Sequence, residues 1–262
     1  MEARGKPGSP LARVRVVLVA PSHPGNIGAA ARAMKTMGLN ELVLVAPRAF
    51  PHPEAEARAS GAEDVLGRAR VCPDLEAAVA DCRWVLGSSA RPRRIGWPTL
   101  DPEAAAKALV ARAEHHPVAV VFGCERTGLS NRELDRCQAV VNIPASAAYS
   151  SLNLAAAVQI MSYELMLAQR GREATGAPHR RGLRDSDRPA TQEELEGFFR
   201  HLERVLTGIG FLDPRHPRKL MRRLYRLFHR AGLEQREINI LRGILTAVEE
   251  RTQLKSDIGT RE

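Results

Sequence analysis

The sequence predicts an α/β domain with a mostly parallel sheet, followed by a linker and a small helical extension. Apolar, β-branched runs alternate with helical stretches over residues 1–169, which is the pattern of a parallel sheet covered by helices. Residues 170–190 are polar, rich in arginine and glycine, and without periodicity, which indicates a basic, flexible linker. Residues 191–262 are helical in pattern and form the expected extension.

Short apolar runs mark the predicted strands. The first, 14–20 (VRVVLVA), is nearly continuous, as expected of a strand covered on both faces. Four more strands are expected at 42–45, 83–87, 118–122 and 139–143. Ligands of such sheets usually bind beyond the carboxyl ends of the strands, so the loops that follow these runs are the candidate site.

Helices are predicted between these strands. The first begins after a loop that holds Gly25 and Gly28, with Asn26 as its expected N-cap. Further helices are expected at 74–81, at 102–114 and, behind a capping box of Ser130 and Glu133, up to Cys137. The last helix of the domain begins near Leu154, after a loop of small residues, and fits either a capped core helix or a helix behind a ligand loop.

Composition indicates a soluble cytoplasmic protein with a polyanionic partner. The net charge is +9 and the sequence pI is about 10, which suits nucleic acid binding. The N-terminus has no signal-peptide pattern, and no apolar run is long enough to span a membrane. The four cysteines form no C-x-x-C pair and have no histidine partner at zinc-ligand spacing, so no metal or disulfide is expected.

The extension contains a basic amphipathic helix. Leu220, Leu224, Leu227 and Phe228 are expected on its apolar face. The other side carries cations with no acid between them: Arg218, Lys219, Arg222, Arg223, Arg226 and Arg230. This pattern fits either a solvated surface or an RNA-binding face, and fits a membrane surface less well because the apolar side is needed for packing.

Three glycine-bearing loops follow predicted strands and could line one pocket. They hold Gly25 with Gly28, Gly87 before two serines, and Gly123 with Gly128. Backbone that lies close to a ligand leaves no room for a Cβ, although an ordinary turn also explains any one of these glycines. The dinucleotide and P-loop motifs are both missing from the sequence.

A few polar side chains in these loops are candidates for chemistry. Arg32 follows the first loop on a helix, where a phosphate can bind, although taken alone it is better explained as a surface arginine. Glu125 and Arg126 form an ion pair or line the site. His23 is a weak candidate for a base, because no Ser-His-Asp arrangement accompanies it.

Three motifs in order make the chain resemble the SPOUT-class RNA 2′-O-methyltransferases of the TrmH type, and among them the bacterial enzymes that modify cytidine and uridine in tRNA. They are NIGAAARAMKTMGL from Asn26, VFGCERTGLSNREL from Val121 and IPASAAYSSLNLAAAVQI from Ile143. The resemblance covers residues 13–169, and the arginine-rich tail also resembles the C-terminal extension of those enzymes. It implies a trefoil knot in the C-terminal part of the α/β domain, an exception to the rarity of knots, and a homodimer formed through the same region.

The resemblance also implies S-adenosylmethionine as the cofactor and ribose at nucleotide 32 of the tRNA anticodon loop as the target. The matching cofactor-binding residues are Ser88, Ser89, Ala90, Gly123, Ile143, Ser150, Ser151 and Leu152. Arg32 matches the residue held to be catalytic, with Asn26, Glu125, Ser151 and Asn153 supporting the site. Ser151 and Asn153 are expected to face the site, and Leu154 and Val158 to face protein.

Several alternatives stay open at this level. Arg32 either loses a proton transiently with help from the substrate phosphate or stays charged and orients the hydroxyl, and we favour the second role because a guanidinium is a poor base. A ribosomal RNA methyltransferase and a non-catalytic RNA-binding relative are the competing functions. No residue is recognisable as a contact that distinguishes cytidine from uridine or selects particular tRNAs.

Overall fold

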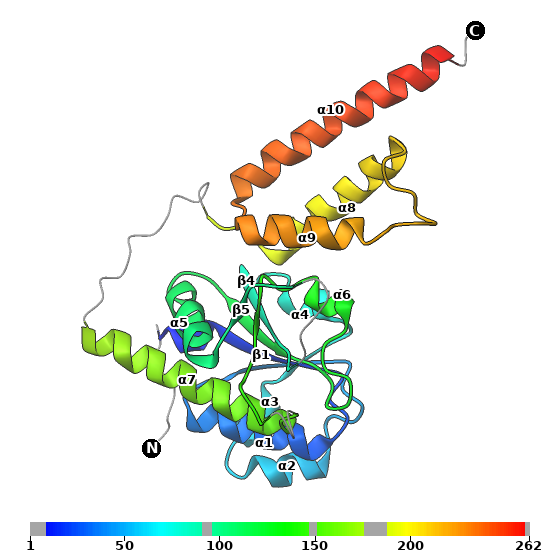
Figure 1. Ribbon diagram of the computed structural model, residues 1–262. Helices are drawn as coiled ribbons and strands as arrows, with labels where there is room; N and C mark the ends of the chain where they lie inside the picture. Colours follow the sequence, from blue (N-terminus) through cyan, green and yellow to red (C-terminus); the bar gives the residue numbers. More distant parts are fainter. Residues whose placement is uncertain (1–8, 91–95, 147–150, 176–187, 260–262) are drawn as a thin grey trace. The chain divides into compact units, whose positions relative to one another are not determined.

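The computed structural model describes residues 9–90, 96–146, 151–175 and 188–259, and the chain divides into two compact units (Figure 1). The first unit spans Met1–Arg181 and the second Gly182–Glu262. The first contains the predicted sheet, and the second is helical. Each unit is therefore described by itself.

Parallel strands form the sheet of the first unit, in the order β3-β2-β1-β6-β4-β7-β5 within the described residues. Their bounds are β1 (Val14–Val19), β2 (Glu41–Val45), β3 (Arg70–Cys72), β4 (Trp84–Ser88), β5 (Thr99–Leu100), β6 (Val118–Phe122) and β7 (Ala139–Val141). The five predicted strands are confirmed, with ends that differ by no more than two residues. Because all strands run in one direction, their carboxyl ends lie at one edge of the sheet.

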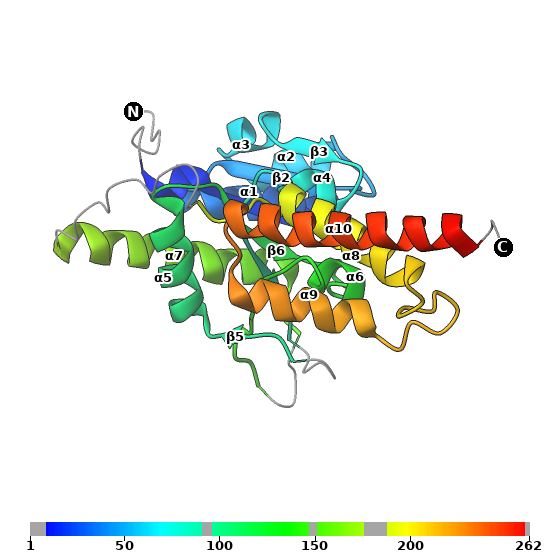
Figure 2. The same ribbon diagram turned by 90° about the horizontal axis from the view of Figure 1, so that it is seen from above.

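Helices cover both faces of this sheet (Figure 2). They are α1 (Pro24–Thr36), α2 (Pro53–Ala59), α3 (Glu63–Gly67), α4 (Leu75–Val79), α5 (Pro102–Ala113), α6 (Asn131–Leu134) and α7 (Leu154–Thr175), after a 3₁₀ turn η1 (Pro10–Arg13). Val16 and Leu18 of β1 join one core cluster with α1, α2, α3, α5 and α7. Val17 and Val19 join a second cluster with α4 and α6, as the two-residue period of a strand requires.

The structure contains short elements that the sequence did not predict. These are η1, α2, α3, β3 and β5, none longer than seven residues. β3 and β5 are the two edge strands, and their apolar residues do not form a continuous run. Such segments carry too few apolar positions to show a period, and tertiary pairing creates them.

Helix α1 begins earlier than predicted, so Asn26 is not its N-cap. Pro24 occupies the first helical position, and His23 is the N-cap residue without a side-chain hydrogen bond. Proline suits this position because the missing N–H would have had no partner inside the helix. Asn26 therefore lies in the first turn, where its amide is available for contacts with other loops.

Helix α7 is longer than predicted and contacts α1 and α5 (Figures 1 and 2). It runs to Thr175, so the first six residues of the predicted linker are helical. The helix can continue through this part of the predicted linker because the first proline there is Pro178. Arg172 also donates a 3.0 Å hydrogen bond to Glu114 at the end of α5. Residues 176–187 of the predicted linker lie outside the described residues.

Within this chain, one side of α7 is buried and the other is partly exposed. Leu154 and Val158 are 6% and 0% exposed, which confirms that they face protein. Tyr163 and Leu167 are 45% and 40% exposed on the other side. The predicted knot involves the loop before α7, where residues 147–150 lie outside the described residues, and it stays a prediction.

In the described part of the second unit, three helices pack around a small core. They are α8 (Gln192–Gly208), α9 (Leu220–Ala231) and α10 (Gln235–Gly259). The predicted start is confirmed, because Thr191 and Glu194 form a capping box at α8. Phe198 and Phe199 are buried in the core, and the ring of Phe228 meets that of Phe198 edge-on at 4.9 Å between centroids.

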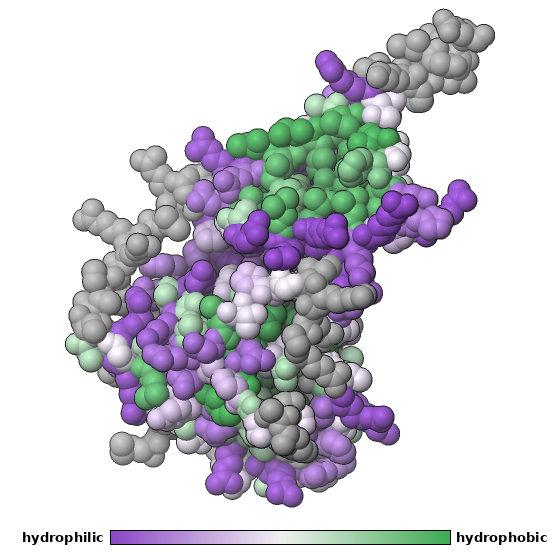
Figure 3. Space-filling model, viewed as in Figure 1, coloured by the Kyte–Doolittle hydropathy of each residue, from purple (hydrophilic) through white to green (hydrophobic). Residues whose placement is uncertain are grey.

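Two features of the predicted basic helix are corrected. Arg218 and Lys219 precede α9 in left-handed backbone conformations, because a turn from Pro217 to Leu220 closes with a 2.8 Å hydrogen bond. Leu227 is 48% exposed, whereas Leu224 and Phe228 pack against the core. Figure 3 shows apolar side chains gathered over this unit, where Ile240 and Ile244 of α10 are also exposed.

No described helix combines the length and the apolar composition needed to cross a membrane. A group of three or more histidine, cysteine or acidic side chains placed to hold a metal ion is also not found among the described residues. The four cysteines are free thiols, and those of Cys72, Cys82 and Cys137 are buried.

Candidate functional site

A cavity of about 270 Å³ opens at the carboxyl ends of β4, β6 and β7, which are neighbours in the sheet. Loops that follow these strands form its walls, together with the start of α7. The lining residues are Ser88, Ser89, Ala90, Phe122, Gly123, Cys124, Glu125, Arg126, Thr127, Gly128, Leu129, Ile143, Ser151, Leu152, Leu154 and Ala157. This is the edge of the sheet where the sequence placed the site.

The structure brings seven of the eight expected cofactor-binding residues to this cavity. They are Ser88, Ser89, Ala90, Gly123, Ile143, Ser151 and Leu152. The eighth, Ser150, lies outside the described residues. Within the described part of the chain, the hydroxyls of Ser88 and Ser151 make no hydrogen bond to protein, so both can serve a ligand. Leu129, Ile143 and Leu154 supply an apolar wall.

Gly28 and Gly123 are required by the close approach of protein backbone and not by a ligand. A Cβ on Gly28 would lie 2.0 Å from the carbonyl oxygen of Ala55, so this glycine lets α1 approach α2. A Cβ on Gly123 would lie 2.2 Å from Leu129 N, inside the loop that follows. The first glycine loop does not line the cavity, so the predicted pocket of three glycine loops is wrong in that part.

Glu125 is bound by the N-terminus of α1 rather than by Arg126. Its carboxylate accepts hydrogen bonds from the Ser22 backbone at 2.9 Å, from the Ser22 hydroxyl at 2.9 Å and from the Asn26 amide at 2.9 Å. His23 N also donates to it at 3.3 Å. Burial alone would raise the pKa of Glu125, but these hydrogen bonds outweigh it and lower the pKa to about 2. The carboxylate is therefore ionised at neutral pH.

Asn26 connects this carboxylate to the entrance of α7. Its side-chain oxygen accepts a 3.0 Å hydrogen bond from the Asn153 amide. The oxygen of Asn153 accepts bonds from Ala155 N at 2.9 Å and Ala156 N at 3.3 Å, so Asn153 caps α7. The chain Glu125, Asn26, Asn153 thus joins the three sequence motifs, although Asn26 and Asn153 do not line the cavity.

Replacing Glu125 with glutamine is expected to lower the free energy of unfolding by about 1 kcal/mol at pH 7, a small value because the carboxylate is partly exposed to solvent. The ordinary pKa of 4.5 falls to about 2 on folding, so this stabilisation is complete above about pH 4.5. It disappears as pH falls toward 2, and the two proteins should converge in acid. Urea unfolding between pH 7 and pH 3 measures the difference.

Glu103→Gln is the matched control for that experiment, because Glu103 forms an exposed pair with Lys107 on α5. Its effect should be close to zero at every pH. A Glu125→Gln difference that stays constant from pH 7 to pH 3 would contradict an ionised carboxylate as the stabilising form.

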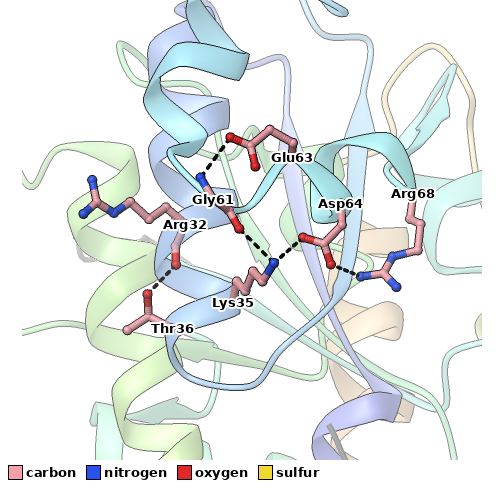
Figure 4. Close-up of polar contacts among 7 residues, drawn as sticks. All are labelled: Arg32, Lys35, Thr36, Gly61, Glu63, Asp64 and Arg68. Carbon is pink, nitrogen blue, oxygen red and sulfur yellow. Dashed lines mark hydrogen bonds and ion pairs between the residues drawn. The ribbon is translucent and has the colours of Figure 1, made fainter. Parts of the chain in front are cut away.

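Arg32 lies apart from the cavity in this chain. It projects from the exposed side of α1 (Figure 4), and its backbone oxygen accepts a 2.8 Å hydrogen bond from the Thr36 hydroxyl. In the described part of the chain its guanidinium makes no hydrogen bond or ion pair. The neighbouring Lys35 is different, because Asp64 and the Gly61 carbonyl bind it at 2.7 and 2.8 Å.

Ser22 was not predicted from the sequence, although its backbone N–H and its hydroxyl both donate hydrogen bonds to Glu125. Ser22 precedes the first motif and belongs to no recognisable sequence motif. Cys124 and Thr127 also line the cavity and were not predicted, although both fall inside the second motif. Both residues could have been predicted if the whole loop of the second motif had been assigned to the site.

Comparison with protein families gives two matches that together span most of the chain. Residues 13–163 match the SpoU rRNA Methylase family. Residues 193–257 match the C-terminal domain of the tRNA methyltransferase TrmJ. The two matches fall in the two structural units.

The relatives that match over nearly their full length are named as tRNA 2'-O-methyltransferases. The chain is 53% identical over 242 residues to the tRNA (cytidine/uridine/adenosine-2'-O-)-methyltransferase TrmJ of Pseudomonas aeruginosa (strain UCBPP-PA14), covering 90% of this chain and 93% of that protein. It is 47% identical to the tRNA (cytidine/uridine-2'-O-)-methyltransferase TrmJ of Yersinia pestis (strain Pestoides F), covering 92% and 93%. The crystal structure of TrmJ from Z. mobilis ZM4 aligns with a TM-score of 0.77 at 37% identity, covering 90% of this chain and 98% of that chain.

Proposed function

Because the chain belongs to the SpoU methylase family and carries a TrmJ-type C-terminal domain, we propose that it methylates a ribose 2′-hydroxyl in tRNA with S-adenosylmethionine. The observation that carries this function is the 53% identity to a tRNA 2′-O-methyltransferase across 90% of the chain, which includes both units. The TrmJ-type extension favours tRNA over ribosomal RNA as the substrate. The motif residues that meet at one cavity favour an enzyme over a non-catalytic relative.

The cavity suits the cofactor in its mixture of polar and apolar walls. The hydroxyls of Ser88 and Ser151 would bind polar groups, and Leu129 and Ile143 would cover the adenine. When bound, the cofactor would supply a methyl group on a sulfonium. The ribose oxygen would form the O–CH3 bond as the S–CH3 bond breaks, S-adenosylhomocysteine would leave, and the hydroxyl proton would pass to bulk solvent. The contribution of the chain is to hold the hydroxyl and the methyl in line and to exclude water.

Arg32 is the proposed catalytic residue. Because a guanidinium is a poor base, Arg32 orients the ribose hydroxyl and stabilises the negative charge that develops on the oxygen. Glu125, Asn26 and Asn153 fix the loops on either side of the reaction, as their hydrogen bonds indicate. Their proposed role is to position the site and not to transfer protons. Ser151 lines the cavity and supports the cofactor.

A homodimer would complete this site. Arg32 does not reach the cavity of its own chain, and α1, which carries it, lies beside α7. The exposed side of α7 presents Tyr163 and Leu167, apolar residues four apart that form one stripe on the helix. Pairing of two copies through α7 would cover this stripe and bring Arg32 of one copy toward the cavity of the other.

The target within tRNA would be ribose 32 of the anticodon loop, in a cytoplasmic enzyme. A single-stranded loop allows one ribose to be exposed without melting a helix. The cations at Arg218, Lys219, Arg222, Arg223, Arg226 and Arg230 would hold the body of the tRNA through phosphates. The basic residues of the extension would then bind the tRNA, and the cavity of the first unit would carry out the methyl transfer.

Calorimetric titration with S-adenosylmethionine tests the assignment of the cavity. We expect binding at one site per chain, and the Ser151→Ala variant should bind about 5- to 10-fold more weakly because one hydrogen bond is lost. Thr246→Ala, on an exposed part of α10, should bind as the unaltered protein does. If the unaltered protein does not bind the cofactor, the non-catalytic RNA-binding function is the better account.

A further inference from the structure

Arg126 is a cation at the mouth of the cavity that the mechanism above does not use. Of the described residues that line the cavity, only Glu125 and Arg126 are charged. Arg126 is exposed, and in the described part of the chain its guanidinium makes no hydrogen bond or ion pair. A cation in this place changes the electrostatic potential of the cavity mouth without contributing to the fold.

The backbone beneath Arg126 is a tight, closed turn. Gly128 N donates a 2.8 Å hydrogen bond to the carbonyl of Cys124, and the two residues form an isolated antiparallel bridge. Gly128 has a φ of +66°, and Gly123 has no space for a Cβ because the same turn folds back on it. Arg126 therefore lies at the tip of a loop whose two ends are fixed.

The neighbouring Glu125 fixes the turn from its other side. Its carboxylate is bound to Ser22 and Asn26 and is not paired with Arg126. The negative charge of Glu125 therefore interacts with the N-terminus of α1, where the helix dipole also favours it. Among the described residues, no acidic side chain pairs with Arg126 at the mouth of the cavity.

We propose that Arg126 binds a phosphate of the tRNA beside the ribose that is methylated, and so sets the target nucleotide against the cavity. This proposal rests on the proposed function, because it needs tRNA as the substrate. A guanidinium matches a phosphate with two parallel hydrogen bonds, which fixes orientation as well as affinity. Its exposure at the rim favours a substrate that arrives from solvent over the cofactor carboxylate, which would be enclosed by the loops.

The test compares Arg126→Ala with Arg132→Ala in the full-length protein. Arg132 is an exposed arginine on α6 that does not line the cavity, so its removal changes the net charge equally. For Arg126→Ala we expect kcat/KM for tRNA to fall by about 10- to 100-fold, the effect of losing a charge-assisted contact. The slope of log affinity against log salt should flatten by about 0.7–0.9, and Arg126→Lys should restore it.

The dissociation constant of S-adenosylmethionine, measured by calorimetry on the same variants, should stay within about twofold of the unaltered value. A rise in that constant by the factor lost in kcat/KM would overturn the proposal and assign Arg126 to the cofactor carboxylate. Equal kcat/KM for Arg126→Ala and Arg132→Ala would also overturn it. Failure of the unaltered protein and of Arg132→Ala to methylate tRNA would instead refute the proposed function.

Discussion

The Arg32→Ala variant should transfer methyl groups at least about 10²- to 10³-fold more slowly than the unaltered protein, while its affinity for S-adenosylmethionine changes by less than about twofold. The guanidinium is exposed and makes no hydrogen bond or ion pair in the described part of its own chain, so its removal leaves no buried group without a partner. It also lies outside the cavity that would hold the cofactor. Single-turnover methylation and calorimetry measure the two quantities separately.

Two variants make the Arg32 result specific. Arg32→Lys keeps the charge but loses the planar fork, and it should recover only part of the rate if the hydroxyl must be oriented. Arg68→Ala removes another exposed arginine, which pairs with Asp64 (Figure 4), and it should be fully active. Equal losses of rate and of cofactor affinity in Arg32→Ala would show that Arg32 supports the fold and not the reaction.

The triple variant Arg222→Ala, Arg223→Ala and Arg226→Ala should bind tRNA at least about tenfold more weakly, with a flatter dependence on salt. Each phosphate contact contributes about 0.7–0.9 to the slope of log affinity against log salt, so three contacts account for a decrease of about 2 to 3. Arg223 is exposed on α9, and its neighbours Arg222 and Arg226 are partly exposed. Filter binding between 50 and 300 mM salt, roughly the range in which such slopes are resolved, gives the result.

A triple lysine variant at the same three positions is the matched control. It keeps every charge, so the salt slope should match that of the unaltered protein while the affinity falls only slightly. The alanine variant should keep its helical unit, because Phe198, Phe199 and Phe228 form the core without these side chains. Binding that is unchanged across the salt range would remove the assignment of α9 to tRNA.

The periodicity of the sequence was sufficient to predict the sheet that positions the site. Runs such as 14–20 and 118–122 are nearly continuous and rich in valine, as expected of strands covered on both faces. The edge strands β3 and β5 were missed because three and two residues carry no measurable period. The limits of α7 were also missed, since Arg172 continues it through a contact with Glu114, 58 residues away.

The identity of the site residues was predictable, but their contacts were not. The motifs located Asn26, Glu125 and Asn153, yet Asn26 and Glu125 are 99 residues apart and Asn26 and Asn153 are 127 apart. No local pattern shows that these side chains form one chain of hydrogen bonds. The ion pair considered for Glu125 and Arg126 was a reasonable local alternative, and the donors of α1 replaced it.

For the glycines too, the sequence predicted the positions correctly but not the reason why glycine is needed there. Gly28 and Gly123 are required by close backbone approach, as proposed from the sequence, but the approaching group is protein in both cases. A carbonyl of α2 and the loop after β6 occupy the space that a ligand was expected to fill. Tertiary neighbours of this kind cannot be read from spacing along the chain.

The central claim is that this chain methylates ribose 32 of tRNA, and one measurement tests it most directly. Unmodified tRNA from cells that lack the modification is incubated with labelled S-adenosylmethionine and the unaltered protein, and the methylated nucleotide is mapped by its resistance to alkaline cleavage. We expect one protected 2′-oxygen, at nucleotide 32, which disappears with Arg32→Ala. A label on a base, at another ribose or only in ribosomal RNA would contradict it.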